Sequence, residues 1–161
     1  MPTPTDIPML NLPACDLHLR RQDASYQVFD FLRRRYVRLT PEEWVRQHFL
    51  HYMIETLGYP AERIAVEFAI KVNNCQKRCD AVVFDKFRQP QMIVEFKAPH
   101  VRLTQHTIDQ VAVYNLRLNV DYFIISNGIT HLAFKLDREA SRFVMCGQLP
   151  DYAGLNRLTE G

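Results

Sequence analysis

Residues 79–97 read CDAVVFDKFRQPQMIVEFK, and this stretch indicates both the fold and the chemistry of the chain. It contains two apolar runs that are typical of β-strands, joined by the polar segment DKFRQP, which predicts a turn. Asp80 stands in the first run, and Glu95 and Lys97 stand in the second. Burying charged groups in apolar strands is costly unless they are paired, so we expect these three side chains to meet and act together.

The spacing within this hairpin indicates a metal site. Glu95 and Lys97 are two residues apart, so their side chains leave the same face of the strand. The hairpin would set Asp80 beside Glu95 on the neighbouring strand. Two carboxylates at that separation repel unless a cation lies between them, and Mg²⁺ takes such oxygen ligands. Lys97 would then contact a phosphate or help to deprotonate the attacking water. The plain alternative is an exposed edge hairpin with a Glu–Lys ion pair on its solvent face.

The composition fits one domain with a local basic face. The chain has 161 residues and a formal net charge of +2, which by itself does not indicate nucleic acid. Six arginines gather between residues 17 and 40: Arg20, Arg21, Arg33, Arg34, Arg35 and Arg38. The cysteines lack zinc-site spacing, which predicts reduced thiols in a cytoplasmic protein. No signal-peptide pattern or bilayer-spanning run is found, so we expect no membrane partner.

The order of predicted elements indicates a mixed α+β domain. Residues 1–16 are proline-rich and predict a loosely held, extended arm. Residues 17–161 predict one domain with its core in 40–136. The expected elements are a β-hairpin (26–31 and 36–39), three strands (63–72, 78–84, 91–97), a helix (103–118) and three more strands (122–126, 129–136, 143–149). Such an order predicts a central mixed sheet flanked by helices.

A first helix is predicted by the start signals around Thr40. Thr40 is a good N-cap, Pro41 suits the first helical position, and Glu43 would complete a capping box with Thr40. Gly58 would end the helix.

The hairpin resembles the PD-(D/E)XK nuclease superfamily, which has the restriction-endonuclease-like fold. Asp80 matches the aspartate of the motif, and Glu95-Phe96-Lys97 matches (D/E)XK. More narrowly, residues 29–136 resemble the N-terminal nuclease domain of type I restriction enzyme R subunits. Cys79 stands where the name of the motif has proline, which is a weak departure.

The second helix adds a further match. Gln110 and Tyr114 lie one turn apart, as in the Gln-x-x-x-Tyr motif of RecB-like members, where the pair helps to position DNA and the catalytic lysine. The plain alternative is a polar helix residue beside a core tyrosine.

Two more acids are considered for the site. Members of the superfamily often supply an acid from the first helix, and Glu42 and Glu43 are the candidates. Glu43 already serves the capping box, whereas Glu42 lies one turn before Val45 on the side that packs inward, so the helix phase favours Glu42. Glu67 either faces Asp80 or Lys97 across the sheet or points to solvent on an alternating strand, and we weigh the two equally.

The resemblance implies a metal-dependent deoxyribonuclease that uses Mg²⁺ or Mn²⁺. Asp80 and Glu95 would bind the metal, with Glu42 as a further ligand, and the basic turn formed by Arg33, Arg34 and Arg35 would contact the DNA backbone. The expected partners are DNA and separately encoded helicase or specificity subunits, and double-strand cutting by one site per chain would favour a homodimer. A second interpretation is a DNA-binding or assembly module that keeps the nuclease fold without cutting. A third is a purely structural hairpin domain.

Overall fold

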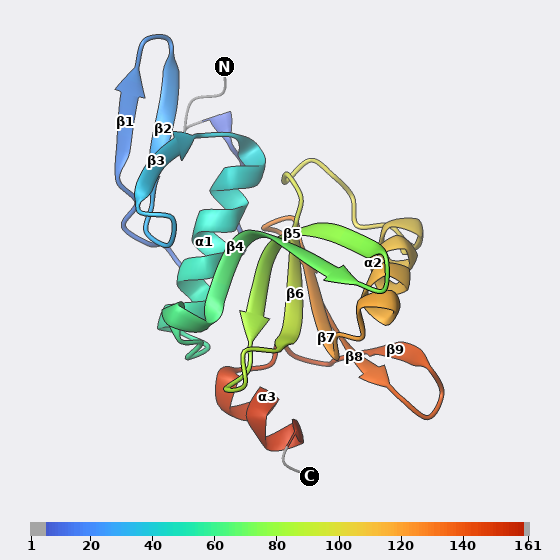
Figure 1. Ribbon diagram of the computed structural model, residues 1–161. Helices are drawn as coiled ribbons and strands as arrows, with labels where there is room; N and C mark the ends of the chain where they lie inside the picture. Colours follow the sequence, from blue (N-terminus) through green and yellow to red (C-terminus); the bar gives the residue numbers. More distant parts are fainter. Residues whose placement is uncertain (1–5, 160–161) are drawn as a thin grey trace.

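The computed structural model describes residues 6–159, which form a small sheet, a larger sheet and helices around them (Figure 1). The larger sheet is mixed and the small N-terminal sheet is antiparallel. The predicted mixed α+β class with a central sheet, flanking helices and an N-terminal hairpin is therefore confirmed.

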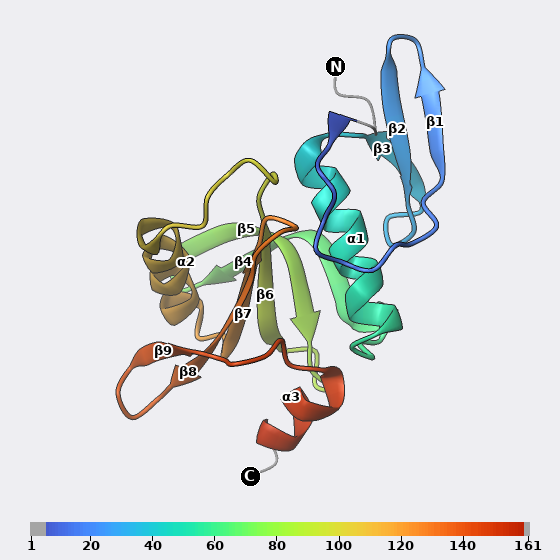
Figure 2. The same cartoon turned by 180° about the vertical axis from the view of Figure 1, so that it is seen from behind.

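The small sheet contains the predicted hairpin and one more strand. Its strands are β1 (Leu19–Gln22), β2 (Ser25–Asp30) and β3 (Arg35–Arg38). Strand β1 was not predicted, because all of its residues are exposed and give no alternating apolar pattern. The sheet stands beside the first turns of helix α1 (Pro41–Glu55), on the side away from α2 (Gln105–Leu118) (Figure 2).

The central sheet has six strands in the order β4-β5-β6-β7-β8-β9. They are β4 (Ile64–Val72), β5 (Cys75–Phe84), β6 (Pro90–Phe96), β7 (Tyr122–Ser126), β8 (His131–Asp137) and β9 (Arg142–Met145), with a 3-10 turn (Ala61–Arg63) before β4. Neighbours are antiparallel except β6 and β7. A parallel pair needs a long crossover, and helix α2 supplies it. The predicted strands thus match these six, with differences only at their ends.

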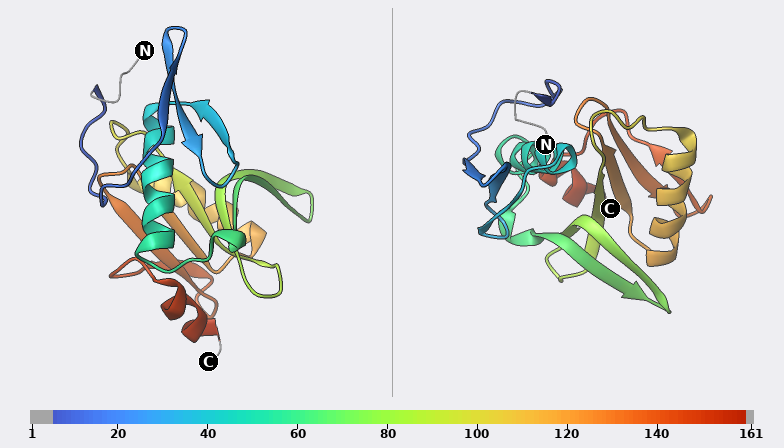
Figure 3. Two further views of the ribbon diagram at one scale, coloured as in Figure 1. Left: turned by 90° about the vertical axis from the view of Figure 1, so that its left-hand side faces the viewer. Right: turned by 90° about the horizontal axis from the view of Figure 1, so that it is seen from above.

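Helices α1 and α2 cover opposite faces of this sheet (Figure 3). Phe49 of α1 packs against Val94 and Phe96 of β6, and the rings of Phe49 and Phe96 meet edge to face with centroids 5.6 Å apart. Val111 of α2 packs with Ile125 of β7 on the other face. The continuous apolar run of β7 is explained by this double cover.

The start of α1 follows its predicted signals, whereas its end does not. The hydroxyl of Thr40 accepts a hydrogen bond from the backbone N–H of Glu43 at 3.0 Å. The helix ends at Glu55, three residues before Gly58, which adopts φ +77° in the following turn. The predicted capping box is not closed, because the carboxylate of Glu43 turns to Arg33.

Both ends of the described chain pack on the domain. Asn11 donates its backbone N–H to the carbonyl of Gly128 at 2.7 Å, and His131 Nε2 lies 2.8 Å from the carbonyl oxygen of Asn11. The described part of the N-terminal arm is therefore fixed on the turn after β7, unlike the loose arm that we expected. Helix α3 (Tyr152–Thr159) was not predicted, and its Leu155 is buried in the core. Within residues 6–159, no helix is long and apolar enough to cross a membrane.

Strands β5 and β6 separate at one end, and this positions the site. The ladder between them stops at the pair Ala81–Val94, whereas β4 and β5 stay paired as far as Val72–Cys75. The β4–β5 hairpin therefore continues alone and projects away from the sheet (Figure 3). An opening between β5 and β6 begins where the ladder stops.

Candidate nuclease site

Asp80 and Glu95 stand directly at this opening. Asp80 precedes Ala81 and Glu95 follows Val94, the last paired residues of the two strands. Asp80 Oδ2 accepts a hydrogen bond from the backbone N–H of Phe96 at 2.8 Å. The carboxylate thus takes the place of the missing backbone partner and ties β5 to β6 where they diverge.

Glu95 and Lys97 share a pocket with the two predicted residues of α2. The pocket has a volume of about 510 Å³ and brings Glu95 and Lys97 together with Gln110 and Tyr114. Its other lining residues are Lys77, Thr107, Val111, Val113 and Arg117. Lys97 is fixed at the end of β6, because its backbone N–H donates to the carbonyl of Ser126 at 2.8 Å. Tyr114 is 41% exposed, so it lines the pocket and does not fill the core.

Glu42 lies within electrostatic reach of the same acids. Burial raises the pKa of Glu42, and the negative charges of Asp80 and Glu95 raise it as well. The positive charges of Arg46 and Lys97 lower it only in part. None of the ion pairs within residues 6–159 involves Glu42. Burial and the two neighbouring carboxylates therefore disfavour its charged form, and no direct ion pair within the described residues offsets them.

The donor chemistry of these three acids suits a hard divalent cation. Carboxylate oxygens are the ligands that Mg²⁺ and Mn²⁺ accept most readily. Glu95 Oε1 is buried, and its ion-pair partner within the described part of the chain is Lys77. Among these residues, however, no three acidic, histidine or cysteine side chains are already arranged to hold a metal ion. The acids fit a metal by chemical type and would have to converge on it.

Two cationic side chains stand beside the acids, and the sequence did not indicate either. Lys77 Nζ lies 2.6 Å from Glu95 Oε1, and one Arg46 amino nitrogen lies 3.4 Å from Asp80 Oδ1. Arg46 is 5% exposed. It follows Glu42 by four residues, so the i,i+4 spacing on α1 was the signal that could have found it.

Lys77 was missed because β5 does not alternate regularly. In a regular strand Lys77 would share a face with Ala81, which packs under α1. Cys79 instead packs with Val82 on the α2 side of the sheet. The alternation is therefore broken next to Asp80, and this brings Lys77 round to Glu95.

Glu67 stands opposite Asp80 in strand β4, at a break in a ladder that is regular on both sides. Its backbone has φ +51°, a left-handed conformation that is unfavourable for a non-glycine residue. Its carboxylate lies 3.3 Å from Arg46, 2.8 Å from Arg78 and 3.6 Å from Arg33. Burial works to raise the pKa of Glu67, but these arginines lower it overall. Of the two expected orientations, Glu67 takes the one toward Asp80, with Arg46 between them.

The three arginines of the β2–β3 turn are not equivalent. Arg33 pairs with Asp30 and Glu43 and contacts Glu67 as described above. Its side chain is only 14% exposed, so it is not free to contact a DNA phosphate as we expected. Arg34 and Arg35 are exposed. The predicted contact with the DNA backbone therefore remains a prediction only for Arg34 and Arg35.

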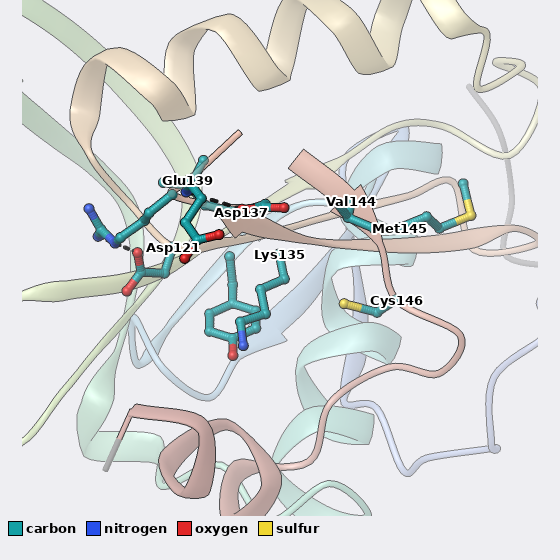
Figure 4. A pocket seen from close by; sticks show the side chains of 10 residues that line it. Asp121, Lys135, Asp137, Glu139, Val144, Met145 and Cys146 are labelled. Atoms are coloured by element: carbon teal, nitrogen blue, oxygen red, sulfur yellow. Dashed lines mark hydrogen bonds and ion pairs between the residues drawn. The ribbon is translucent and has the colours of Figure 1, made fainter. Parts of the chain in front are cut away.

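A larger pocket of about 920 Å³ lies at the other end of the sheet (Figure 4). Asp121, Asp137 and Glu139 gather at one side of it, and Val144 and Met145 at the other. It is formed where β7 begins and β8 ends, whereas the carboxylate opening is at the end of β7. None of the predicted site residues lines it. Size alone therefore does not select the candidate site, and the smaller pocket is the candidate because predicted site residues line it.

Comparison with known proteins gives the same family as the motif. Residues 41–150 match the family model described as type I restriction enzyme R protein N terminus (HSDR_N). No curated protein matches the chain. Among solved structures, a fragment assigned to the HsdR subunit of a type I restriction enzyme from Vibrio vulnificus matches with a TM-score of 0.52 and 18% identity. The match covers 74% of this chain and 25% of that one, so the chain spans about a quarter of the length of that protein. The family match covers more than half of the chain, and the protein therefore belongs to the type I restriction enzyme R protein N-terminal family.

Proposed function

We propose that this chain is a metal-dependent deoxyribonuclease domain that hydrolyses DNA phosphodiester bonds. The observation that carries the proposal is the pocket in which Glu95 and Lys97 from β6 meet Gln110 and Tyr114 from α2. Asp80 adjoins Glu95 at the opening, and Glu42 is electrostatically coupled to both acids. Membership in the R protein family supports a restriction-enzyme nuclease domain.

The charges of the pocket suit a phosphodiester. Three cationic side chains, those of Lys77, Lys97 and Arg117, line it together with Glu95. This excess of positive charge would attract the DNA backbone, and it would do so without regard to sequence. Lys97 is the cation closest in sequence to the acids, and it would stabilise the charge that develops on the phosphate in the transition state.

The metal would be held by Asp80, Glu95 and Glu42. When bound, Mg²⁺ or Mn²⁺ would polarise the phosphate and lower the pKa of a bound water. The acids contribute the negative charge that offsets the cation, and the hydrogen bond from Phe96 holds the Asp80 carboxylate in place at the opening. Gln110 and Tyr114 would position the DNA strand across the pocket from Lys97.

A second function is favoured by the cations that already contact two of the acids. Lys77 lies against Glu95 and Arg46 lies against Asp80, so the acids are partly neutralised without a metal. A DNA-binding or assembly module that does not cut would need only this neutralisation of its acids and no metal ion. In either case the chain would act with helicase or specificity subunits of a type I system or as a homodimer on DNA.

Plasmid cleavage in Mg²⁺ or Mn²⁺ separates the two functions. The wild-type chain should nick or degrade DNA, and Lys97→Ala should lower the cleavage rate about 10²–10³-fold, as expected for loss of one transition-state charge contact. The matched control is Lys71→Ala on the exposed side of the β4–β5 hairpin, which should cut at the wild-type rate. DNA binding without cleavage across several metals and DNA forms would instead establish the non-cutting module.

A further inference from the structure

Lys77 links the metal-binding acid to the DNA-positioning helix. Its ammonium lies 2.6 Å from Glu95 Oε1 and 4.6 Å from the centroid of the Tyr114 ring. The side chains of Lys77 and Glu95 are 15% and 11% exposed. Lys77 therefore sits inside the pocket between two groups to which we assign different tasks.

We propose that Lys77 is a displaceable internal counter-ion, which occupies Glu95 in the metal-free protein and must leave before a divalent cation binds there. The proposal rests on the nuclease function above and adds a regulatory element to the same site. The contacted atom, Glu95 Oε1, is buried, and Lys77 is its ion-pair partner within the described chain. An ammonium on this oxygen can be replaced by a divalent cation, because the carboxylate attracts a doubly charged ion more strongly and two cations on one oxygen repel each other.

The surroundings of Lys77 allow such a displacement. It is carried by the part of β5 that has left β6, so its backbone pairs with Ile70 of β4 on one side and has no ladder to β6 on the other. The aromatic face of Tyr114 offers the ammonium a second favourable contact in the same pocket. Arg46 differs in this respect, because its guanidinium also contacts Glu43 and Glu67 and is nearly fully buried. Among the described residues, Lys77 thus has one carboxylate partner to leave, whereas Arg46 has three.

A fixed structural salt bridge makes the opposite prediction for metal affinity. If Lys77 competes with the metal, removing its charge should strengthen metal binding by the free energy now spent on displacing it. If Lys77 instead holds Glu95 in its binding geometry, removing it should weaken metal binding. The sign of the change therefore decides between the two roles.

Calorimetric titration of the full chain with Mn²⁺ provides the test. Lys77→Met keeps the length of the side chain and removes the charge, and it should bind Mn²⁺ about 10-fold more tightly than wild type. Lys77→Arg keeps the charge and should bind like wild type. Lys71→Met, on the exposed side of the same hairpin, is the matched control and should also bind like wild type.

Thermal unfolding gives an independent readout without any cleavage. In EDTA, Lys77→Met should melt at a lower temperature than wild type, because Glu95 loses its counter-ion, and saturating Mn²⁺ should remove this difference. If Lys77→Met does not fold, Lys77→Gln replaces it in both measurements. Equal or weaker Mn²⁺ binding by the neutral variant would overturn the proposal while the metal site stands. Absence of Mn²⁺ binding in wild type and variant alike would overturn the metal-dependent function and, with it, the role of Lys77.

Discussion

Two groups of charged residues flank the first turn of α1, and they differ in how completely their carboxylates are matched. The paired cluster consists of Asp30, Arg33, Glu43, Arg46 and Glu67. The open cluster consists of Glu42, Asp80, Glu95 and Lys97. In the paired cluster every carboxylate contacts at least one arginine. In the open cluster Glu42 has no ion pair within the described residues, Glu95 contacts one lysine, and Asp80 contacts one arginine, Arg46 of the paired cluster.

The contrast is sharpest between two neighbours in the sequence, Glu42 and Glu43. Both are glutamates in the first helical turn, and burial raises the pKa of both. Arginine charges counteract this effect in part for both residues, and a nearby acid adds to it for both. Glu43, however, forms direct ion pairs with Arg33 and Arg46, whereas Glu42 has no ion pair within the described residues. The difference teaches that residue type and helical position do not separate a structural acid from a functional one. The residues that contact each acid from other parts of the fold separate the two kinds.

Removing Arg33 should break the paired cluster and have the largest effect on stability. Arg33→Met leaves fully buried Asp30 and nearly buried Glu43 without their shared cation. Loss of one partner of a buried ion pair typically costs about 3–5 kcal/mol, and we expect this loss in the free energy of unfolding. Urea unfolding followed by the fluorescence of Trp44 measures it. Arg34→Met is the exposed control and should stay within about 0.5 kcal/mol of wild type; an equal loss in both variants would contradict the assignment.

Asp30→Asn should show a smaller loss with a defined pH dependence. Burial works to raise the pKa of Asp30, but hydrogen bonds from the backbone and guanidinium of Arg33 lower it below 3.8. The charged form is therefore favoured by folding, and this stability is present above pH 3.8 and is lost as the pH falls below it. At pH 7 the variant should lose about 1.5–3 kcal/mol, the value of a hydrogen bond to a charged group. Urea unfolding at several pH values should show that the difference in unfolding free energy between the variant and wild type shrinks below pH 3.8. A difference that stays constant with pH would contradict this prediction.

Much of this contrast could be predicted from the sequence, because local signals carry it. Thr40 caps the start of α1 as expected, and Glu42, the acid that the helix phase favoured, lies within electrostatic reach of Asp80. Glu43, the expected capping-box acid, turns to Arg33 instead. The spacing of Glu95 and Lys97 and that of Gln110 and Tyr114 placed each pair on one face, and both pairs line the same pocket.

Two of the counter-ions, Lys77 and Arg33, could not be predicted, since they depend on irregular backbone and on long-range contacts. Lys77 reaches Glu95 only because alternation fails in β5, and Glu67 reaches Arg46 from a strand position with φ +51°. Arg33 resembled a surface arginine in a basic run, because no sequence signal near it indicates ion pairs with Glu43 and Glu67. Strand β1 gave no signal for a different reason, since its residues are all exposed.

Glu42→Gln should change stability in the opposite direction to Asp30→Asn. The pKa of Glu42 is raised above 4.5, so folding disfavours its charged form, and stability falls as the pH rises above 4.5. At pH 7 the neutral variant should be more stable than wild type by about 0.5–2 kcal/mol, a gain typical of removing an unfavourable charge. Below pH 4.5 the difference should disappear. The same variant should bind Mn²⁺ more weakly in calorimetry. If the variant were less stable than wild type at pH 7, Glu42 would have a stabilising partner, and its place in the open cluster would be wrong.

The exposed arginines beside the paired cluster should affect DNA binding and leave stability almost unchanged. We expect Arg34 and Arg35, but not Arg33, to contact phosphates. The double variant Arg34→Gln/Arg35→Gln should then lower the steepness of log DNA affinity against log salt concentration by about 2, one for each lost contact. Fluorescence anisotropy of a labelled duplex between low and moderate salt, in EDTA to prevent cutting, measures the slope. Arg142→Gln on strand β9 removes an exposed charge at the far edge of the central sheet and serves as the control. If Arg142→Gln lowers this slope as much per removed charge as the double variant does, the net charge of the protein attracts the DNA, and not a surface beside the opening.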